Sequence, residues 1–350
     1  MQRSSSWRSD TVLHYHLRFY QLLGLHAVPL NCSSGHSERL LRLWAGCLLA
    51  GFTCMALVCV SSGEVLHKSD HFGHFNDALK FAFAELAVLS IYWETIFHRR
   101  HLSRFWQLHT MMGTPAKLGR YLCMFYGTLS FELMLLLMLV YVQQLTRQLF
   151  LFWCTFQPFV FLAHLRNTQF VLHLELLRQQ LLQLERELAL LAEYSNFAQR
   201  FDGFECYMRR RLRQQQLNYA RIYDMCVCFS SCFSYSVLTV LLMIFIRIAV
   251  DCYFMYYTIY NNIDNIDYYL LLPAILEIPA FIFTSQSCMR LVPRIAFQLH
   301  NILCSSSSLS LQVNILHLFF AQFKCIFSFS SKTFHCKFCI SRCASIVLEL

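Results

Sequence analysis

The chain has little charge, little glycine and little proline, and these shortages define its class. Only 14% of its 350 residues are charged and 57% are hydrophobic, whereas soluble domains carry about 25% charged residues. With 10 glycines and 6 prolines, it has no flexible or proline-rich stretch that would separate domains. The composition excludes an ordinary soluble fold and predicts one membrane-embedded body.

Motifs that would indicate catalysis are also missing. The chain has no phosphate-binding loop, no GxSxG sequence and no paired carboxylates. Histidines with di-iron-like spacing form two groups, His67, His71 and His74, then His98 and His101. A predicted span separates the groups and places them on opposite sides of the membrane, so they cannot share a metal. We expect no enzyme activity, no cofactor and no metal site.

The 17 cysteines do not form a recognisable framework. Most of them lie in apolar stretches, where a thiol is a small packing group. The sequence "HCKFCISRC" (335–343) resembles half of a zinc site, but no second pair lies nearby. The first 20 residues are polar and basic, so no cleavable signal is visible.

Six apolar stretches have the length of a membrane-spanning helix. They cover residues 43–60, 81–97, 121–142, 148–165, 225–246 and 268–287. A seventh candidate, residues 309–330, is interrupted by Asn314, His317 and Lys324. We therefore predict an all-α, multi-span integral membrane protein of the seven-transmembrane-helix type.

Lys and Arg are concentrated in every second connecting segment. Because cytoplasmic segments retain basic residues, this alternation predicts a cytoplasmic N-terminus. The predicted parts are a cytoplasmic segment 1–42, a six-span body 43–287 with a cytoplasmic helical extension 166–222, a cytoplasmic segment 288–312, and residues 313–350 as an uncertain seventh span or aberrant tail. The sequon at Asn31 would then stay unmodified.

The densest basic cluster precedes the fifth predicted span. It consists of Arg209, Arg210, Arg211 and Arg213. We interpret it as the topology-determining charge that keeps this end of the span in the cytoplasm. Because it adjoins a spanning segment and no nucleic-acid-binding fold is visible, we expect no nucleic-acid partner.

A leucine stripe runs along the predicted cytoplasmic extension. Its members alternate in steps of three and four residues: Leu174, Leu177, Leu181, Leu184 and Leu188. This spacing predicts a helix with one apolar seam. The seam contacts either another subunit or other parts of the same chain.

Two acidic residues lie near the middle of predicted spans, Glu132 in the third and Glu277 in the sixth. Charge in hydrocarbon is costly and usually faces a cavity or the protein interior. Together with Trp153, Phe156 and Tyr268 they are our candidate ligand-binding residues. The alternative is a buried carboxyl group that binds no ligand.

The chain resembles the insect gustatory receptors, within the insect chemoreceptor superfamily. The resemblance rests on the cytoplasmic N-terminus, on "HLRFYQLLGL" (16–25) before the first span, and on "LRQQQLNYARIYDMCVCFSSCFSYSVLTVLL" (212–242) entering the fifth. It extends over about residues 10–312. It implies a ligand-gated, non-selective cation channel of the plasma membrane that detects small-molecule tastants. It also implies a tetramer whose cytoplasmic helices meet around a central pore.

The end of the chain departs from this family pattern. Members carry Thr-Tyr, five residues, then Gln-Phe in the last span, whereas this chain has Gln322-Phe323 but Ile315-Leu316 in place of Thr-Tyr. We therefore assign no pore residues. Val313-Asn314 is what an unspliced donor site would encode, so we expect the residues after Gln312 to be read-through. The alternative is a divergent seventh helix.

Two functions from other classes compete with a channel. A G-protein-coupled receptor would have the same number of spans and the opposite orientation, but no acidic-Arg-aromatic triplet follows the third span and no NPxxY occurs late in the chain. An integral membrane enzyme is disfavoured by the separated histidines.

Overall fold

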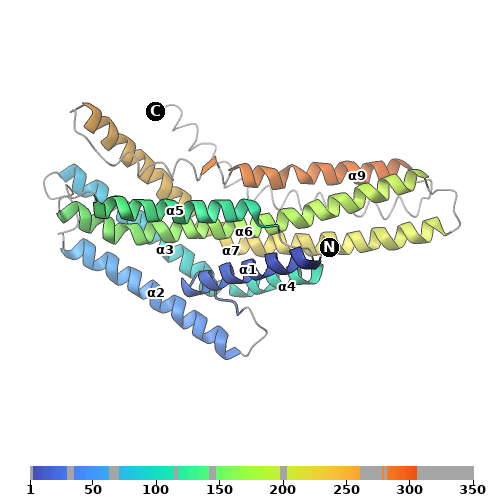
Figure 1. The fold of residues 1–350 in the computed structure, drawn as a ribbon, viewed down its shortest axis with the longest axis horizontal. Coiled ribbons are helices and arrows are strands. Elements are labelled where there is room, and N and C mark those ends of the chain that lie inside the picture. The colour runs from blue at the N-terminus through green and yellow to red at the C-terminus, as the bar shows by residue number, and fades with distance from the viewer. Residues whose placement is uncertain are drawn as a thin grey trace. The chain divides into compact units, whose positions relative to one another are not determined.

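The computed structural model describes residues 3–29, 35–62, 71–113, 117–141, 147–197, 203–260, 278–279 and 282–305. Within these ranges every regular element is a helix (Figure 1). The helices are α1 (Arg3–Leu22), α2 (Gly35–Ser62), α3 (His71–Phe97), α4 (Arg99–Met112), α5 (Gly119–Tyr141), α6 (Arg147–Phe197), α7 (Phe204–Tyr260) and α9 (Leu291–Ser305). The all-helical class is thereby confirmed for the described part of the chain.

The first five predicted spans lie in α2, α3, α5, α6 and α7, except that residue 142 falls outside the described residues. In the described residues, three helical segments are long and apolar enough to cross a membrane: His36–Ser61, Gly119–Leu137 and Phe204–Tyr253. Most of the sixth predicted span and all of the seventh lie outside the described residues. The number of spans and the orientation of the N-terminus stay predictions.

The chain divides into two compact units. Unit 1 comprises Met1–Leu102, Leu118–Leu172 and Cys232–Ile282, and unit 2 comprises Ser103–Lys117, His173–Ser231 and Phe283–Leu350. Helices α4, α6 and α7 contribute residues to both units.

A glycine turn ends α1 in unit 1. The N–H of Leu25 donates to the carbonyl of Tyr20 at 2.8 Å and the N–H of Gly24 donates to that of Gln21 at 3.0 Å, the hydrogen-bond pattern of a Schellman cap. Gly24 has φ 69°, and a Cβ there would lie 2.9 Å from Leu48 and 3.0 Å from Tyr92. The glycine of "QLLGL" is therefore needed both for its backbone conformation and for the lack of a side chain.

A chain of hydrogen bonds fastens α1 to its neighbours in unit 1. The Tyr121 hydroxyl lies 2.9 Å from His16 Nδ1 and 3.1 Å from the Tyr20 hydroxyl, which lies 2.9 Å from Thr168 Oγ1. Burial lowers the pKa of His16 and raises that of Tyr20. Burial therefore favours the neutral form of both side chains.

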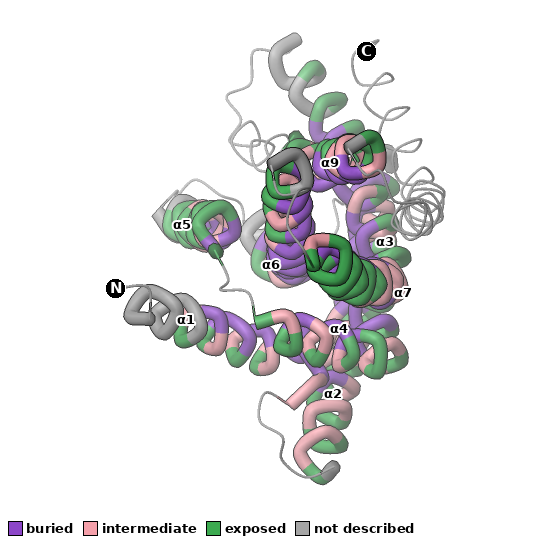
Figure 2. Tube along the Cα trace, turned by 90° about the vertical axis from the view of Figure 1, so that its right-hand side faces the viewer, coloured by how far each residue is buried: buried purple, intermediate pink, exposed green. Residues whose placement is uncertain are grey.

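Helices α2 and α5 expose apolar side chains, and α5 is mostly green in Figure 2. Their exposed large residues include Leu43, Leu57, Leu133, Leu136 and Leu137. Such faces are unusual on soluble proteins and are typical of helices in contact with lipid tails.

Unit 2 is built around the predicted leucine stripe of α6. Leu174, Leu177, Leu181, Leu184 and Leu188 are all buried within the single chain. Contacts from the same chain therefore cover the stripe, which is one of the two alternatives that the sequence left open. Contact with another subunit stays a prediction.

Candidate functional site

Glu132 of α5 is buried and lies among polar side chains of α6. It accepts a short hydrogen bond from Gln157 Nε2, and its Oε1 lies 3.8 Å from His164 Nε2. Gln157 and His164 are seven residues apart and therefore project from one side of α6. Glu132 is 5% exposed, which fits both a ligand-binding carboxyl group and a buried one without a ligand, so its part in ligand binding stays a prediction.

Aromatic rings of unit 1 continue from this polar group along α6. The rings of Trp153 and Phe156 are 6.1 Å apart, and Phe156 lies 5.3 Å from Phe81 of α3. Phe81 in turn lies 6.1 Å from Phe159, which packs against Phe52 of α2 at 5.1 Å. The structure therefore places Trp153 and Phe156 on α6, the helix whose Gln157 donates to Glu132 of α5, within an aromatic cluster joining α2, α3 and α6.

The other two candidate ligand-binding residues, Tyr268 and Glu277, lie outside the described residues. The three that are described are buried, with Glu132 and Trp153 each 5% exposed. Carboxylate, amide and imidazole groups beside aromatic rings can bind an amine or hydroxyl group together with an apolar body. This is the chemistry that the candidate site offers.

A second buried polar group of unit 1, which we call the Arg166 clip, is held together by several hydrogen bonds. It consists of Arg166, Glu94, Gln169, Ser236 and the carbonyl of Cys232. Arg166 Nε donates to Ser236 Oγ at 3.0 Å, one terminal nitrogen donates to Gln169 Oε1 at 2.8 Å, and the other donates to the Cys232 carbonyl at 2.6 Å and to Glu94 Oε2 at 3.1 Å. Arg166 is only 2% exposed.

The clip is electrically compensated and extends into the backbone of α7. Glu94 Oε1 accepts the N–H of Tyr235 at 2.7 Å, and its Oε2 accepts a short bond from the Ser236 hydroxyl. The guanidinium carbon also lies 4.2 Å from the ring centroid of Phe233. A buried ion pair is tolerated only when its remaining polar atoms are hydrogen-bonded, and here they are.

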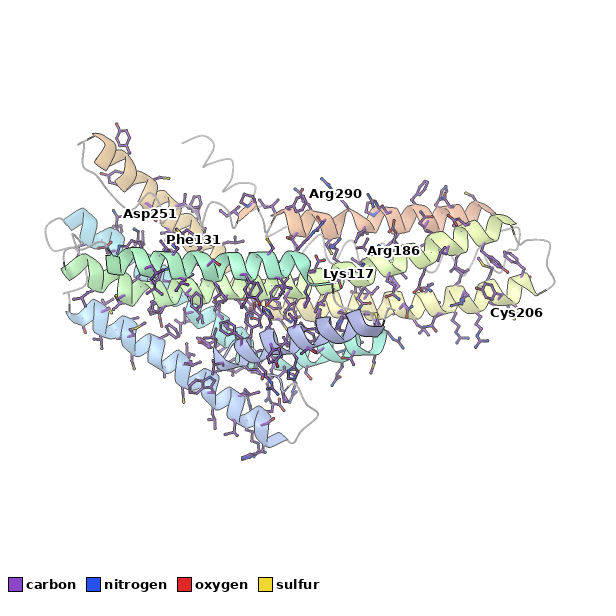
Figure 3. All side chains as sticks on the ribbon, in the orientation of Figure 1. Lys117, Phe131, Arg186, Cys206, Asp251 and Arg290 are labelled. Atoms are coloured by element: carbon purple, nitrogen blue, oxygen red, sulfur yellow. The ribbon has the colours of Figure 1, made fainter. Side chains whose placement is uncertain are left out.

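A third charged group of unit 1 joins α3 to the later part of α7. Lys80 Nζ lies 2.5 Å from Asp251 Oδ1, and Arg247 Nε lies 3.5 Å from Asp251 Oδ2. All three side chains are buried, and Figure 3 labels Asp251 on α7. The pairing gives each of these charges an opposite charge at short range.

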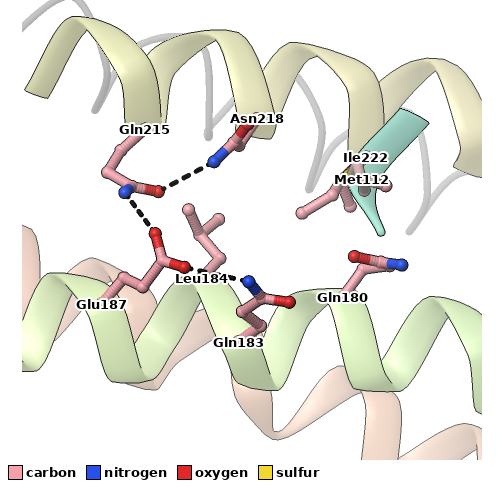
Figure 4. Close-up of a pocket in the computed structure, with 8 residues that line it drawn as sticks. All are labelled: Met112, Gln180, Gln183, Leu184, Glu187, Gln215, Asn218 and Ile222. Atoms are coloured by element: carbon pink, nitrogen blue, oxygen red, sulfur yellow. Dashed lines mark hydrogen bonds between the residues drawn. The ribbon is translucent and has the colours of Figure 1, made fainter. Parts of the chain in front are cut away.

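Unit 2 contains a polar cavity of about 30 Å³, drawn in Figure 4. Glu187 is one of its lining residues and accepts hydrogen bonds from Gln183 at 2.9 Å and from Gln215. Leu184 of the stripe and Met112 also line it. The space suits water molecules and is far smaller than a typical pocket for an organic ligand.

The predicted topology-determining cluster is exposed near the start of α7. Arg209, Arg210, Arg211 and Arg213 all face solvent. Arg209 pairs with Glu205 at 3.2 Å, and Arg211 donates to the Tyr207 hydroxyl at 3.3 Å. The exposure agrees with a solvated charge cluster, and its role in orientation stays a prediction.

Sequence reasoning missed most of the buried polar groups. Residue 166 stood at the start of the predicted cytoplasmic extension 166–222 and Asp251 lay outside every predicted span, whereas both side chains are buried in unit 1. Gln157 and His164 carry a usable signal, because they are the polar residues on one face of an apolar segment. A single sequence gives no signal for the burial of Arg166, because its partners Glu94 and Ser236 lie 72 and 70 residues away.

Apolar helices with compensated charges buried among them are typical of an integral membrane protein. The chain belongs to the 7tm chemosensory receptor family, which matches residues 13–328. No curated protein matches the chain. The resemblance to a chemoreceptor family is confirmed, and this is not an enzyme family. The match continues beyond Gln312, so our expectation that the family pattern stops there was wrong; read-through itself stays a prediction.

Proposed function

We propose that this chemosensory receptor is a subunit of a ligand-gated, non-selective cation channel that detects small-molecule tastants. Membership of the 7tm chemosensory receptor family over residues 13–328 carries the proposal. The protein acts in the plasma membrane, with its N-terminus in the cytoplasm and the apolar faces of α2 and α5 against lipid.

In this proposal the tastant binds near Glu132, Trp153 and Phe156, and Tyr268 and Glu277 complete the pocket. Support comes from the polar contacts of Glu132 with Gln157 and His164 next to a cluster of rings. Replacing Glu132 by Gln keeps the shape of the side chain and removes its charge. The half-maximal tastant concentration should change while the surface level stays the same.

The channel itself is tested by recording currents from cells that express the full chain together with candidate partner subunits, against a broad tastant panel. We expect cationic currents that persist when G-proteins are blocked. Responses carried only by second messengers and abolished by the block would favour the competing G-protein-coupled receptor.

Orientation separates the same two functions independently. An N-terminal epitope tag should be labelled only after the cells are permeabilised. Labelling on intact cells would contradict the proposed topology.

We further propose a tetramer, either of this chain alone or with related subunits. Because the α6 leucines are buried within one chain, substituting Asp for Leu181 or Leu184 would test folding of unit 2 and not assembly alone. Native mass spectrometry of the detergent-solubilised wild type is the cleaner measurement. A monomer under mild conditions would contradict the tetramer.

A further inference from the structure

The Arg166 clip bonds to the backbone of α7 as well as to side chains. The carbonyl of Cys232 accepts from the guanidinium at 2.6 Å, and the N–H of Tyr235 donates to Glu94 at 2.7 Å. Both groups belong to the interior of a helix, where backbone groups ordinarily bond along the helix axis. Side chains inserted at such a point are a recognised cause of local bending in helices.

The clip fixes one register of three helices in unit 1. Arg166 belongs to α6, Glu94 to α3, and Cys232, Tyr235 and Ser236 to α7. Gln169 Nε2 adds a bond to the carbonyl of Leu25 at 3.0 Å, which includes the segment after α1. Since these partners are fixed in number and direction, sliding or rotating α7 by one residue would break several charge-assisted bonds at once.

The clip lies where two of these helices leave unit 1. The division between the units falls between Leu172 and His173 in α6 and between Ser231 and Cys232 in α7. Arg166 is therefore within two turns of the first point and Cys232 adjoins the second. The clip therefore fixes α6 and α7 near the ends of their unit 1 segments.

We infer that Arg166 is a positioning residue for gating. It holds α7 in the register of one of the two gating states, closed or open, and the change to the other state breaks the clip. The inference rests on the proposed channel function. In a two-state equilibrium, a change that weakens one state must move basal current and half-maximal ligand concentration in opposite directions. A residue that only contacts ligand would move the second quantity and leave the first unchanged.

The decisive variant is Ser236→Ala, which removes the partner of Arg166 Nε and a donor to Glu94 without leaving a buried charge unpaired. Ser231→Ala is the matched control, because its hydroxyl donates to the Val227 carbonyl at 3.0 Å within α7. We expect Ser236→Ala to shift basal current and half-maximal concentration in opposite directions by roughly two- to tenfold, the effect of one hydrogen bond. Ser231→Ala should shift neither.

A native thiol reports on the clip without any current. Cys232 is 5% exposed, whereas Cys206 near the start of α7 is exposed. Labelling of the solubilised full chain by N-ethylmaleimide, read at each cysteine by mass spectrometry, should rise roughly two- to tenfold at Cys232 in Ser236→Ala. Labelling at Cys206 should stay the same.

The outcomes separate the inference from the proposed function. Unchanged Cys232 labelling overturns the clip, and increased labelling with unchanged currents overturns its part in gating. If the wild type reaches the surface and no tastant evokes current, the channel proposal fails, and labelling alone then decides whether the clip holds α7. If Ser236→Ala reaches the surface poorly, Gln169→Ala removes a different acceptor of Arg166 and makes the same test.

Discussion

Two ion pairs of unit 1 are buried, whereas an ion pair of unit 2 is exposed. In unit 1 the pairs Arg166 with Glu94 and Lys80 with Asp251 are no more than 7% exposed in any side chain. In unit 2 the pair of Arg104 with Asp224 is 61% and 42% exposed. Similar ion pairs therefore lie in different surroundings, and burial determines how much stability is lost when each pair is broken.

The cost of breaking a pair follows from desolvation. A buried charge that loses its partner keeps the full penalty of having left water, whereas an exposed charge regains its hydration. The buried pairs of unit 1 should therefore be sensitive to single changes that the exposed pair of unit 2 tolerates.

Arg166→Ala should destabilise the protein by about 3–5 kcal/mol, because it leaves Glu94 buried without its counter-charge. Thermal unfolding of the detergent-solubilised protein, followed by fluorescence-detected gel filtration, measures the loss. The double variant Arg166→Met with Glu94→Gln removes both charges and should recover much of it. A double variant as unstable as the single one would show that packing, and not charge, dominates.

Acidification should weaken unit 1 through His26. Burial, with a smaller effect of the nearby Arg166 charge, lowers the pKa of His26 from 6.5 to about 3. Between these two pKa values His26 is protonated in the unfolded chain and neutral in the folded chain. The free energy of unfolding therefore falls as the pH drops below 6.5. The loss should reach about 2 kcal/mol at pH 5.

The measurement for His26 is the apparent melting temperature at pH 7 and pH 5. His26→Gln, which does not titrate, is the control and should lose less stability than the wild type over this interval. An equal loss in both proteins would assign the pH dependence to other groups.

Gly24→Ala should cost roughly 1–2 kcal/mol, the price of a left-handed backbone conformation in a residue with a Cβ. Close approach to Leu48 and Tyr92 adds to the cost. Gly113, which also has positive φ but open space around it, is the matched control for crowding. If Gly24→Ala and Gly113→Ala lower the melting temperature equally, crowding at Gly24 contributes nothing.

Much of the fold, and little of the site, was predictable from the sequence. The length of an apolar run predicts a membrane-spanning helix from local composition alone. Apart from residue 142, the first five expected spans fall inside described helices. Burial of Glu132 followed from the cost of charge in hydrocarbon. The partners of Arg166 and Asp251 come from distant helices, and a charged residue near the end of a span has the same local pattern whether it meets solvent or a partner.

The smallest effect is expected where the contrast predicts tolerance. Arg104 Nη2 lies 2.7 Å from Asp224 Oδ2 in unit 2, a distance between the 2.5 Å and 3.1 Å of the two buried pairs. Because water replaces a lost partner at an exposed site, Arg104→Ala should cost at most about 1 kcal/mol. A double-mutant cycle with Asp224→Ala isolates the pair itself, and its coupling should shrink further at high salt. A coupling of several kcal/mol that resists salt would mean that short distance alone determines the strength of these pairs, and the contrast between the units would lose its physical basis.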